Sequence, residues 1–426
     1  MDLREVLLGG PFRDLGTEVD PMMEAASISA SDQNIPWIAR AKGFPGFRMA
    51  GNVLSTRDAI ARALGVTVKG IPDIINEAVS RPLPFQVVEV PKYYKEVSPR
   101  DVPIPTYYST DGGPYVTSGI FHAGYRGNFN LSYHRMMKLE DDRFAIRVVP
   151  RHLNALLREA ESNGDDLPAA VSIGSDAGAL IAGSISMQFG QDEMKVASSL
   201  HELMTGKPLQ VFAPGGGEDG PKAPVGTEIV LLGRVTAERV REGPFVDITS
   251  TLDLSGMEPG EPIFEVDRVL VRDDPIVHVL LPGGYEHYMM MGLPKEPSIL
   301  QSVRKVVPRV HAVRLTEGGC CWLHGVVSIT KQKEGDGKNA IMAAFTGHPS
   351  MKMVTVVDED IDIFDDRQVE WAVATRFQAD RDLVLIPNAR GSTLDPSSHG
   401  GDGTTTKMGI DATMPVKDRD PFRKVK

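Results

Sequence analysis

A series of short β-prone segments between about residues 114 and 280 constrains the fold more than any other feature of this chain. The segments are separated by Gly and Pro breaks, and they read YVTSGIFHA, FAIRVVP, AAVSIGS, TEIVLLGRVTAERV, FVDITSTLDL and PIFEVDRVLVR. Two helical patterns interrupt them, one after Pro150 and one from about Asp192. This pattern predicts a β-barrel or sandwich with helical insertions.

Both flanks of the β-rich region mix helices and strands. A helix is predicted from about Ser55, where a hydroxyl cap is followed three residues later by an acid. The last part of the chain alternates helical and strand patterns, which favours a second α/β layer. A chain of 426 residues is long enough for two or three domains, and the Pro-, Tyr- and Gly-rich stretch at 93–115 indicates a boundary near residue 100.

Composition narrows the class of protein. The formal net charge is −11 and no long basic run occurs, which argues against nucleic acid as a partner. No signal-peptide core and no stretch of about 18 apolar residues is present, so we expect a cytoplasmic protein without membrane association. The two cysteines, Cys320 and Cys321, are neighbours and are expected to be packed thiols rather than a disulfide.

Several common catalytic and nucleotide-binding motifs are absent from the sequence. It has no GxGxxG leading from a strand into a helix, no GxxxxGK(S/T), no GxSxG and no HExxH. The glycine run in PGGGEDG precedes a strand, so we expect a flexible loop there and not a phosphate cradle.

Three separate segments supply the polar residues of a candidate site. NFNLSYHRM contains Asn130, His134 and Arg135, the helix start in VVPRHLNALL contains His152, and GQDEMKVA contains Glu193. An amide oxygen, an imidazole and a carboxylate are ligands that suit Mg²⁺ or Mn²⁺ when phosphate and water complete the shell. A single histidine is more often a surface or packed residue than a ligand, so this prediction requires the three segments to meet in space.

A pair of acids, Glu242 and Asp247, forms the second candidate feature. They lie five residues apart across the Pro-containing turn of REGPFVD. Two carboxylates beside an arginine can hold one acid protonated while the other stays ionised. The alternative is that EGPF is only a polar turn between two strands.

Through these and later motifs, the sequence resembles the UbiD family of decarboxylases over roughly residues 100 to 415. NLSYHR resembles the family's Asn-x-x-x-x-Arg element, VVPRHL the histidine that follows it, and REGPFVD the strand with paired acids. Later segments resemble further landmarks in the same order, and these include GLPKEPSIL, VTVVDEDID, STLDPSS and above all TKMGIDATMP.

The resemblance implies an α/β protein in which a split β-barrel binds prenylated FMN between two further α/β domains. We therefore predict an N-terminal domain at residues 1–100, the barrel at 101–298 and a C-terminal domain at 299–426. The C-terminal domain would serve oligomerisation, so we expect a homodimer or a higher homo-oligomer. A flavin prenyltransferase would supply the cofactor.

The resemblance also assigns ligand roles to particular residues. Asn130, His152 and Glu193 would hold the divalent metal, Mn²⁺ or Mg²⁺, against the cofactor phosphate, and K⁺ is a further expected cation. Ser132 and Lys407 are expected cofactor contacts.

Catalytic roles follow from the same resemblance. Arg135, Glu242 and Asp247 would form an acid–Arg–acid network beside the flavin, so Arg135 is also a cofactor contact. Asp247 is assigned as the proton donor and Glu242 as the partner that orients Arg135, with the reverse assignment of the two acids left open. One departure from the family pattern is Val246, which replaces a glycine between the acids, and we expect it to change the shape of the substrate pocket.

Substrate class is the last inference from the sequence. The compact length and the segment LPGGYEHYMMMG favour the archaeal-type branch that decarboxylates trans-anhydromevalonate 5-phosphate in isoprenoid synthesis. Alternatives are a reversible decarboxylase of aromatic or heteroaromatic acids such as hydroxybenzoates, a non-catalytic flavin-binding subunit, and an unrelated metalloenzyme that shares only the ligands. A phosphorylated substrate needs cations in the pocket, whereas an aromatic ring needs a flat apolar slot.

Overall fold

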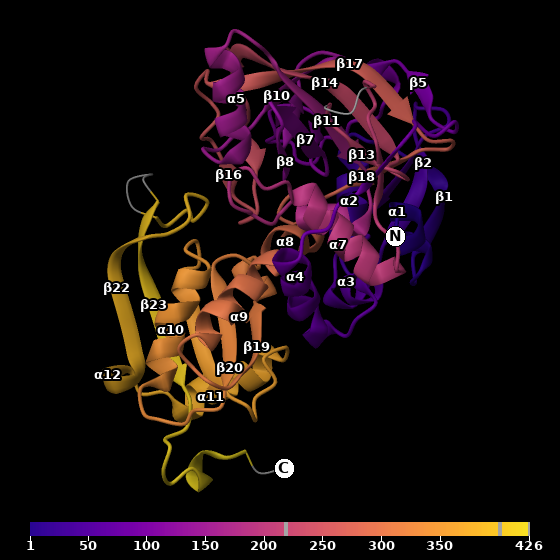
Figure 1. The fold of residues 1–426 in the computed structure, drawn as a ribbon. Helices are drawn as coiled ribbons and strands as arrows, with labels where there is room; N and C mark the ends of the chain where they lie inside the picture. Colours follow the sequence, from indigo (N-terminus) through magenta and orange to yellow (C-terminus); the bar gives the residue numbers. More distant parts are fainter. Residues whose placement is uncertain (217–219, 399–402, 425–426) are drawn as a thin grey trace. The chain divides into compact units, whose positions relative to one another are not determined.

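The chain forms two compact units, residues 1–290 and 291–426 (Figure 1). The structure is a computed structural model, and it describes residues 1–216, 220–398 and 403–424. Of the glycine run that was expected to be a flexible loop, residues 217–219 lie outside the described residues.

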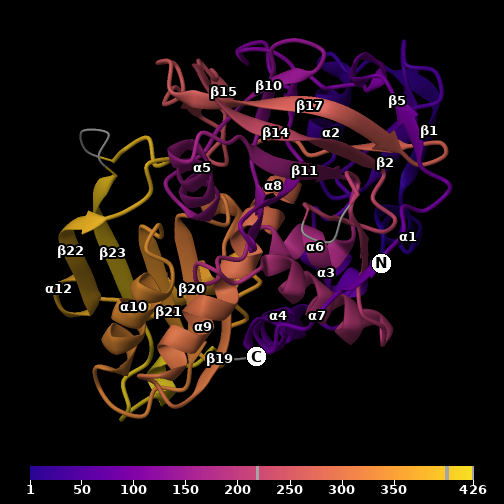
Figure 2. The same ribbon diagram turned by 45° about the horizontal axis from the view of Figure 1, so that its top comes forward.

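A nine-stranded antiparallel sheet forms the centre of the first unit (Figure 2). In chain order its strands are β5 (Lys95–Val97), β6 (Tyr115–Val116), β7 (Ile120–Tyr125), β8 (Asn128–Tyr133), β9 (Met136–Lys138), β10 (Arg143–Ile146), β11 (Leu167–Ile173), β14 (Ile229–Val240) and β17 (Glu261–Val271). Their order across the sheet is β6-β9-β10-β17-β14-β11-β7-β8, and β5 also pairs with β17. The β-rich centre predicted from the sequence is therefore present.

The two longest strands of this sheet, β14 and β17, change register at Gly233. A Cβ atom at Gly233 would lie 1.9 Å from the backbone oxygen of Glu265. Only glycine fits where the two backbones approach this closely.

A second sheet joins the beginning of the first unit to its end. Its order is β1 (Arg13–Val19), β2 (Trp37–Ala41), β3 (Arg48–Gly51) and β18 (Ile276–Val279), and β18 runs parallel to β3. A small sheet likewise pairs β4 (Gln86–Val88) with β12 (Gln210–Phe212), which pairs in turn with β13 (Ala223–Pro224). Strands from both sides of residue 100 thus pair with each other, and the predicted domain boundaries at residues 100 and 298 stay predictions.

The helices that begin in the first unit are α1 (Leu3–Leu8), α2 (Glu24–Ser31), α3 (Arg57–Leu64), α4 (Ile71–Ser80), α5 (His152–Ser162), α6 (Ala177–Ala182), α7 (Glu193–Thr205) and α8 (Tyr285–Gly292). The cap predicted for α3 was wrong by one residue. Thr56, not Ser55, accepts from the backbone N–H of Ala59 at 3.1 Å. Ser55 lies one residue before this cap and donates its hydroxyl to the backbone oxygen of Asn52 at 3.0 Å.

Two helices of this unit begin at predicted site residues. α5 begins at His152 and buries three leucines in the core. α7 begins at Glu193, and the side chain of Asp192 caps it by accepting from the backbone N–H of Met194 at 2.8 Å. Both helical insertions predicted from the sequence are confirmed.

The second unit contains one five-stranded sheet with helices (Figure 1). The strand order is β19 (Val310–Leu315), β20 (His324–Ile329), β21 (Met353–Asp358), β23 (Thr404–Ala412) and β22 (Leu383–Arg390). β20, β21 and β23 are parallel, and the two edge strands are antiparallel to their neighbours. The helices are α9 (Glu296–Arg304), α10 (Asp336–Gly347), α11 (Asp366–Arg376) and α12 (Ala379–Asp382). The predicted α/β fold class is confirmed.

Cys320 and Cys321 form no disulfide bond with any residue that the structure describes, and Cys321 is buried. Across the described residues, we find no helix with both the length and the apolar character needed to cross a membrane.

Candidate active site

The three residues predicted to bind a metal lie together in the first unit. Asn130 is on β8, His152 begins α5 and Glu193 begins α7. The Nδ2 atom of Asn130 donates to Oε2 of Glu193 at 3.0 Å, and Nδ1 of His152 lies 3.4 Å from Oε1 of Glu193. The three segments therefore meet in space, while the metal-binding role of these residues stays a prediction.

Glu193 is fully buried. Its Oε2 atom also accepts from the backbone N–H of Leu131 at 3.0 Å, whereas the buried Oε1 atom has no hydrogen-bond partner among the residues that the structure describes. Burial raises the pKa of Glu193, because the carboxylate loses hydration. A buried carboxylate oxygen without a donor, beside an imidazole nitrogen, suits a divalent cation.

The rest of the coordination shell would have to come from other groups. In the described ranges, no three or more His, Cys, Asp or Glu side chains cluster in a way that could hold a metal. The amide of Asn130, with phosphate and water, would complete the shell around His152 and Glu193. This donor set fits a hard cation such as Mg²⁺ or Mn²⁺ held against a phosphate.

Ser132 and His134 support the amide of Asn130. The Ser132 hydroxyl donates to Oδ1 of Asn130 at 2.7 Å and lies 2.9 Å from Nε2 of His134, whose Nδ1 lies 2.9 Å from the backbone oxygen of Arg147. Burial lowers the pKa of His134 to about 4, so its imidazole is neutral near pH 7. Ser132 thus lies in the predicted cofactor region, and its contact with the cofactor stays a prediction.

A second cluster surrounds Arg135, which lies between β8 and β9. Its Nε and Nη2 atoms donate to the two oxygens of Glu242 at 2.9 and 2.7 Å, and Nη1 donates to Asp247 at 2.7 Å. Burial opposes the charge of Arg135, but these carboxylates outweigh it and raise its pKa above the ordinary value. The expected acid–Arg–acid contact is present, and the catalytic roles of its members stay predictions.

The sequence analysis misses a third carboxylate in this cluster, that of Asp253. Its Oδ2 atom lies 3.0 Å from Nη1 of Arg135. Asp253 ends β16 (Leu252–Asp253), which pairs with β15 (Phe245–Val246) so that Asp253 lies opposite Phe245. The signal in the sequence was the polar run of residues 249–251, because a hairpin at that point returns the second acid toward the first.

Aromatic side chains enclose the Arg135 cluster. The ring of Phe245 lies 4.4 Å from the guanidinium carbon of Arg135, and the Tyr115 hydroxyl donates to Oε1 of Glu242 at 2.8 Å. Burial and the neighbouring Glu242 raise the pKa of Tyr115, so it remains a hydrogen-bond donor. Val246, which replaces the glycine of the family pattern, is buried in the same hairpin.

His287 on α8 is another residue that the sequence analysis did not single out. Its Nδ1 atom accepts from the backbone N–H of Gly283 at 3.1 Å, so the ring proton is on Nε2. Burial lowers the pKa of His287, and the charges of Asp247 and Arg135 act on it in opposite directions. His287 is therefore a neutral donor in the electrostatic range of the Arg135 cluster. It belongs to no short motif, so only the fold reveals it.

Lys407 lies in the second unit, on β23. Its ammonium group donates to the backbone oxygens of Pro349 and Met351 at 2.6 and 2.5 Å. Burial lowers the pKa of Lys407 to about 8. Within its own unit the group already has two acceptors, and its predicted contact with the cofactor phosphate stays a prediction.

The two clusters share one stretch of backbone. Asn130 and Arg135 are five residues apart on nearly extended chain, a distance of about 16 Å. A cation site at one end and an arginine with several acids at the other suit a ligand that carries a phosphate at one end and a ring at the other. This geometry favours a flavin mononucleotide over a ligand bound by either cluster alone.

Comparison with known proteins identifies the class that this fold and site define. Three models of the 3-octaprenyl-4-hydroxybenzoate carboxy-lyase match consecutive parts of the chain: the N-terminal domain at residues 10–79, the Rift-related domain at 78–285 and the C-terminal domain at 288–412. The chain belongs to this UbiD family and is a carboxy-lyase.

Two archaeal decarboxylases are similar to this chain over nearly its full length. The anhydromevalonate phosphate decarboxylase of Methanothermobacter thermautotrophicus is 43% identical over 413 residues, which are 96% of this chain and 95% of that protein. The enzyme of the same name from Methanosarcina mazei is 41% identical over 97% of this chain and 96% of its own length.

Solved structures agree with this assignment. The UbiD-class enzyme HmfF from Pelotomaculum thermopropionicum, in complex with FMN, matches with a TM-score of 0.92 and 35% identity, covering 100% of this chain and 97% of that one. An evolved dimeric form of HmfF in complex with prFMN matches with a TM-score of 0.87 and 33% identity over 100% of this chain and 96% of that one.

Proposed function

We propose that this carboxy-lyase removes CO2 from trans-anhydromevalonate 5-phosphate with prenylated FMN as its cofactor. The observation that carries the proposal is the Arg135 cluster, in which one guanidinium contacts Glu242, Asp247 and Asp253. Arg135 follows Asn130, a member of the predicted metal-binding set, by five residues. The names of the archaeal relatives, at 41–43% identity, support the choice of substrate.

Prenylated FMN, when bound, supplies the electron sink that loss of CO2 from an unsaturated acid requires. Asn130, His152 and Glu193 would hold Mn²⁺ or Mg²⁺ against its phosphate, with Ser132 orienting the amide of Asn130. The bound FMN and prFMN of the HmfF structures support the cofactor assignment. Potassium remains a prediction to which we assign no residue.

Arg135 serves first to hold the acids in place. Each of its three guanidinium nitrogens already has a carboxylate partner, so the side chain has little freedom to move. Glu242 is fully buried and accepts two of these bonds, which fixes the plane of the guanidinium. Glu242 is therefore the orienting acid.

Asp247 is the better placed proton donor of the two predicted acids. Its side chain is 17% exposed, against 0% for Glu242, so it can exchange protons with solvent. When the bond to CO2 breaks, the substrate carbon takes a proton from the carboxylic acid of Asp247, which becomes a carboxylate paired with Arg135.

A second candidate function is the decarboxylation of an aromatic or heteroaromatic acid. The gallate decarboxylase of Lactiplantibacillus plantarum, which is 28% identical over 90% of this chain, favours it. A non-catalytic flavin-binding subunit is disfavoured because Arg135 and both predicted acids are in contact. The archaeal relatives are more similar to this chain than the aromatic-acid enzymes, which decides our choice.

The experiment uses protein produced with and without a flavin prenyltransferase. Each preparation receives trans-anhydromevalonate 5-phosphate or a hydroxybenzoate, and CO2 release and the flavin absorption band are measured. We expect CO2 from the phosphorylated acid only, and only with the prenyltransferase. Release from the hydroxybenzoate alone would establish the second candidate, and absence of a flavin band in both preparations would exclude both.

Three further features belong to the same proposal. We place the protein in the cytoplasm, we expect a homodimer or a higher homo-oligomer, and we expect it to receive its cofactor from a flavin prenyltransferase. Size-exclusion chromatography with light scattering tests the oligomeric state directly.

A further inference from the structure

A cavity in the first unit is not used by the chemistry described above. Its volume is about 480 Å³, and it is lined by the end of β10, by one face of α5 and by the ends of β14 and β17. Three of the lining side chains are arginines, Arg147, Arg158 and Arg239, and two are glutamates, Glu161 and Glu261. A cavity with this lining binds polar rather than apolar ligands.

The charges of the cavity favour an anion. Arg147 pairs with Glu261, and Arg239 pairs with Glu161. Arg158 is exposed and forms no ion pair with any residue that the structure describes. Three cations against two carboxylates leave one positive charge, and guanidinium groups bind phosphate through paired N–H donors.

Hydrogen bonds link Arg147, which lines the cavity, to the Arg135 cluster. The backbone N–H of Arg147 donates to the backbone oxygen of Arg135 at 3.2 Å, and the two residues are opposite each other in the extension of the β9–β10 pair. Residues opposite each other on antiparallel strands project from the same face. The side chains are also linked, because Nη2 of Arg147 donates to the Ser255 hydroxyl at 2.9 Å and the Ser255 N–H donates to Asp253 at 2.9 Å.

The cavity lies on the opposite side of α5 from the predicted metal ligand. His152 begins α5, whereas Asn154, Leu157 and Glu161 line the cavity. With about 100° per residue in an α-helix, these three positions point roughly 140° to 200° away from His152. The cofactor phosphate, which we place at His152, therefore does not account for the cavity.

We propose that this cavity binds the phosphate group of the substrate while the carboxylate lies beside the Arg135 cluster. The inference rests on the proposed function, because it assumes an acid with a phosphate at the far end of a short carbon chain. Arg158 and Arg239 supply the phosphate contacts. Arg147 lies between the substrate phosphate and the substrate carboxylate. The cavity then determines selectivity for phosphorylated acids over unphosphorylated ones.

The test compares Arg158→Gln and Arg239→Gln with Arg234→Gln as a matched control. Arg234 lies on β14 like Arg239 and also forms surface ion pairs, but it does not line the cavity. The cofactor-loaded enzyme receives anhydromevalonate with and without its phosphate. We expect each cavity variant to lose about 10- to 100-fold in kcat/KM for the phosphorylated acid, with no change for the unphosphorylated acid, no change in flavin content and no effect of Arg234→Gln.

Other results overturn the proposal. Equal losses on both acids assign these arginines to general structure, a loss of flavin together with activity assigns them to the cofactor, and unchanged kcat/KM places the phosphate elsewhere. If the wild type does not decarboxylate the phosphorylated acid, the proposed function fails instead. Calorimetric titration with inorganic phosphate then still decides the inference, because binding by the wild type that is lost in Arg158→Gln and Arg239→Gln supports an anion site and absence of binding overturns it.

Discussion

Arg135 is outnumbered by the acids that contact it. Three carboxylates lie within 3.0 Å of one guanidinium, so the fully ionised cluster would carry two more negative than positive charges. Burial alone would raise the pKa of Asp253, but the charge of Arg135 outweighs burial and holds that pKa below its ordinary value.

The first prediction concerns Asp247. Asp247→Asn keeps the size of the side chain but removes the acid, so we expect kcat to fall by about 10²–10⁴-fold, the usual contribution of a general acid. The flavin should remain bound, because Asp247 is not part of the cation set. Turnover and flavin absorbance of the purified variant measure both effects.

Asp253→Asn is the matched control for that variant. It removes another carboxylate from the same Nη1 atom of Arg135, but it leaves Asp247 intact. We expect a fall in kcat of about tenfold or less, from loss of one charged hydrogen bond. If Asp253→Asn abolished turnover and Asp247→Asn did not, the roles of the two acids would be exchanged.

The second prediction concerns pH and His134. Its pKa is about 4 in the folded protein, against an ordinary value of 6.5, so the unfolded chain binds the extra proton more readily than the folded chain. The stabilisation is complete above about pH 6.5 and is lost as the pH falls toward 4. The full difference is about 3 kcal/mol.

Denaturant unfolding of the wild type and of His134→Gln at pH 7 and pH 5 measures this effect. We expect the wild type to lose more of its free energy of unfolding between the two pH values than the variant does. Equal losses would mean that other groups cause the pH dependence.

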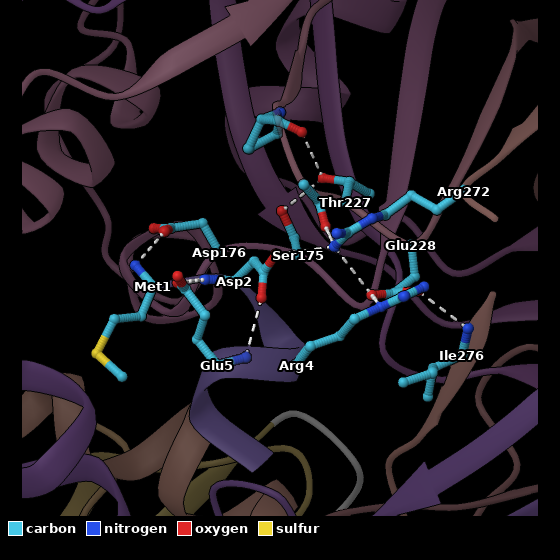
Figure 3. Close-up of polar contacts among 12 residues, drawn as sticks. Met1, Asp2, Arg4, Glu5, Ser175, Asp176, Thr227, Glu228, Arg272 and Ile276 are labelled. Carbon is cyan, nitrogen blue, oxygen red and sulfur yellow. Dashed lines mark hydrogen bonds and ion pairs between the residues drawn. The ribbon is translucent and has the colours of Figure 1, made fainter. Parts of the chain in front are cut away.

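At the scale of elements, hydrogen bonds of one buried glutamate, Glu228, link the beginning of the chain to the central sheet (Figure 3). Glu228 is fully buried and accepts from Arg4 at 2.6 and 2.7 Å, from Arg272 at 3.2 Å and from the backbone N–H of Ile276 at 3.1 Å. Ile276 begins β18, so the same carboxylate contacts α1 and the strand that completes the N-terminal sheet.

The third prediction is that Glu228→Gln destabilises the first unit. The change leaves Arg4 and Arg272 without their shared countercharge, and loss of one partner of a buried ion pair costs about 3–5 kcal/mol. Glu96→Gln is the control, because Glu96 forms an exposed pair with Arg268, worth about 1 kcal/mol at most. Thermal unfolding followed by circular dichroism compares them, and equal shifts in melting temperature would contradict the prediction.

Sequence patterns predicted the elements and the short motifs better than the contacts between distant segments. The helices at α5 and α7 followed from periodicity and a cap. The contact of Arg135 with its two acids followed from the resemblance to the UbiD family, because spacing alone left a polar turn as the alternative. Asp253 and His287 reach the site through a hairpin and through the packing of α8. The pairing of β18 with β3 also depends on tertiary contacts, which propensity and period do not encode.

At the scale of the whole molecule, the two units differ in how their sheets are assembled. Every strand of the second unit's sheet comes from within residues 310–412. The first unit instead combines β3 with β18, β4 with β12 and β5 with β17. Its early and late segments therefore depend on each other for their hydrogen bonds.

The fourth prediction follows from this difference. A fragment of residues 291–426 should fold alone and unfold cooperatively, because it has its own sheet and core. A fragment of residues 101–290 should not, because β12, β17 and β18 lose partners and expose backbone donors and acceptors. Circular dichroism and thermal unfolding of both fragments test this, and a cooperative transition in the fragment 101–290 would support an independent domain beginning near residue 100.

The parallel pairing of β3 with β18 also has a consequence for biosynthesis. Gly51 ends β3 and Ile276 begins β18, so a ribosome working at about 5–20 residues per second takes about 10–50 seconds to pass from one to the other. During that interval the nascent chain presents β3 as an open strand edge to every other chain nearby. Protection of this edge by a chaperone would then govern the yield of active enzyme in the cell.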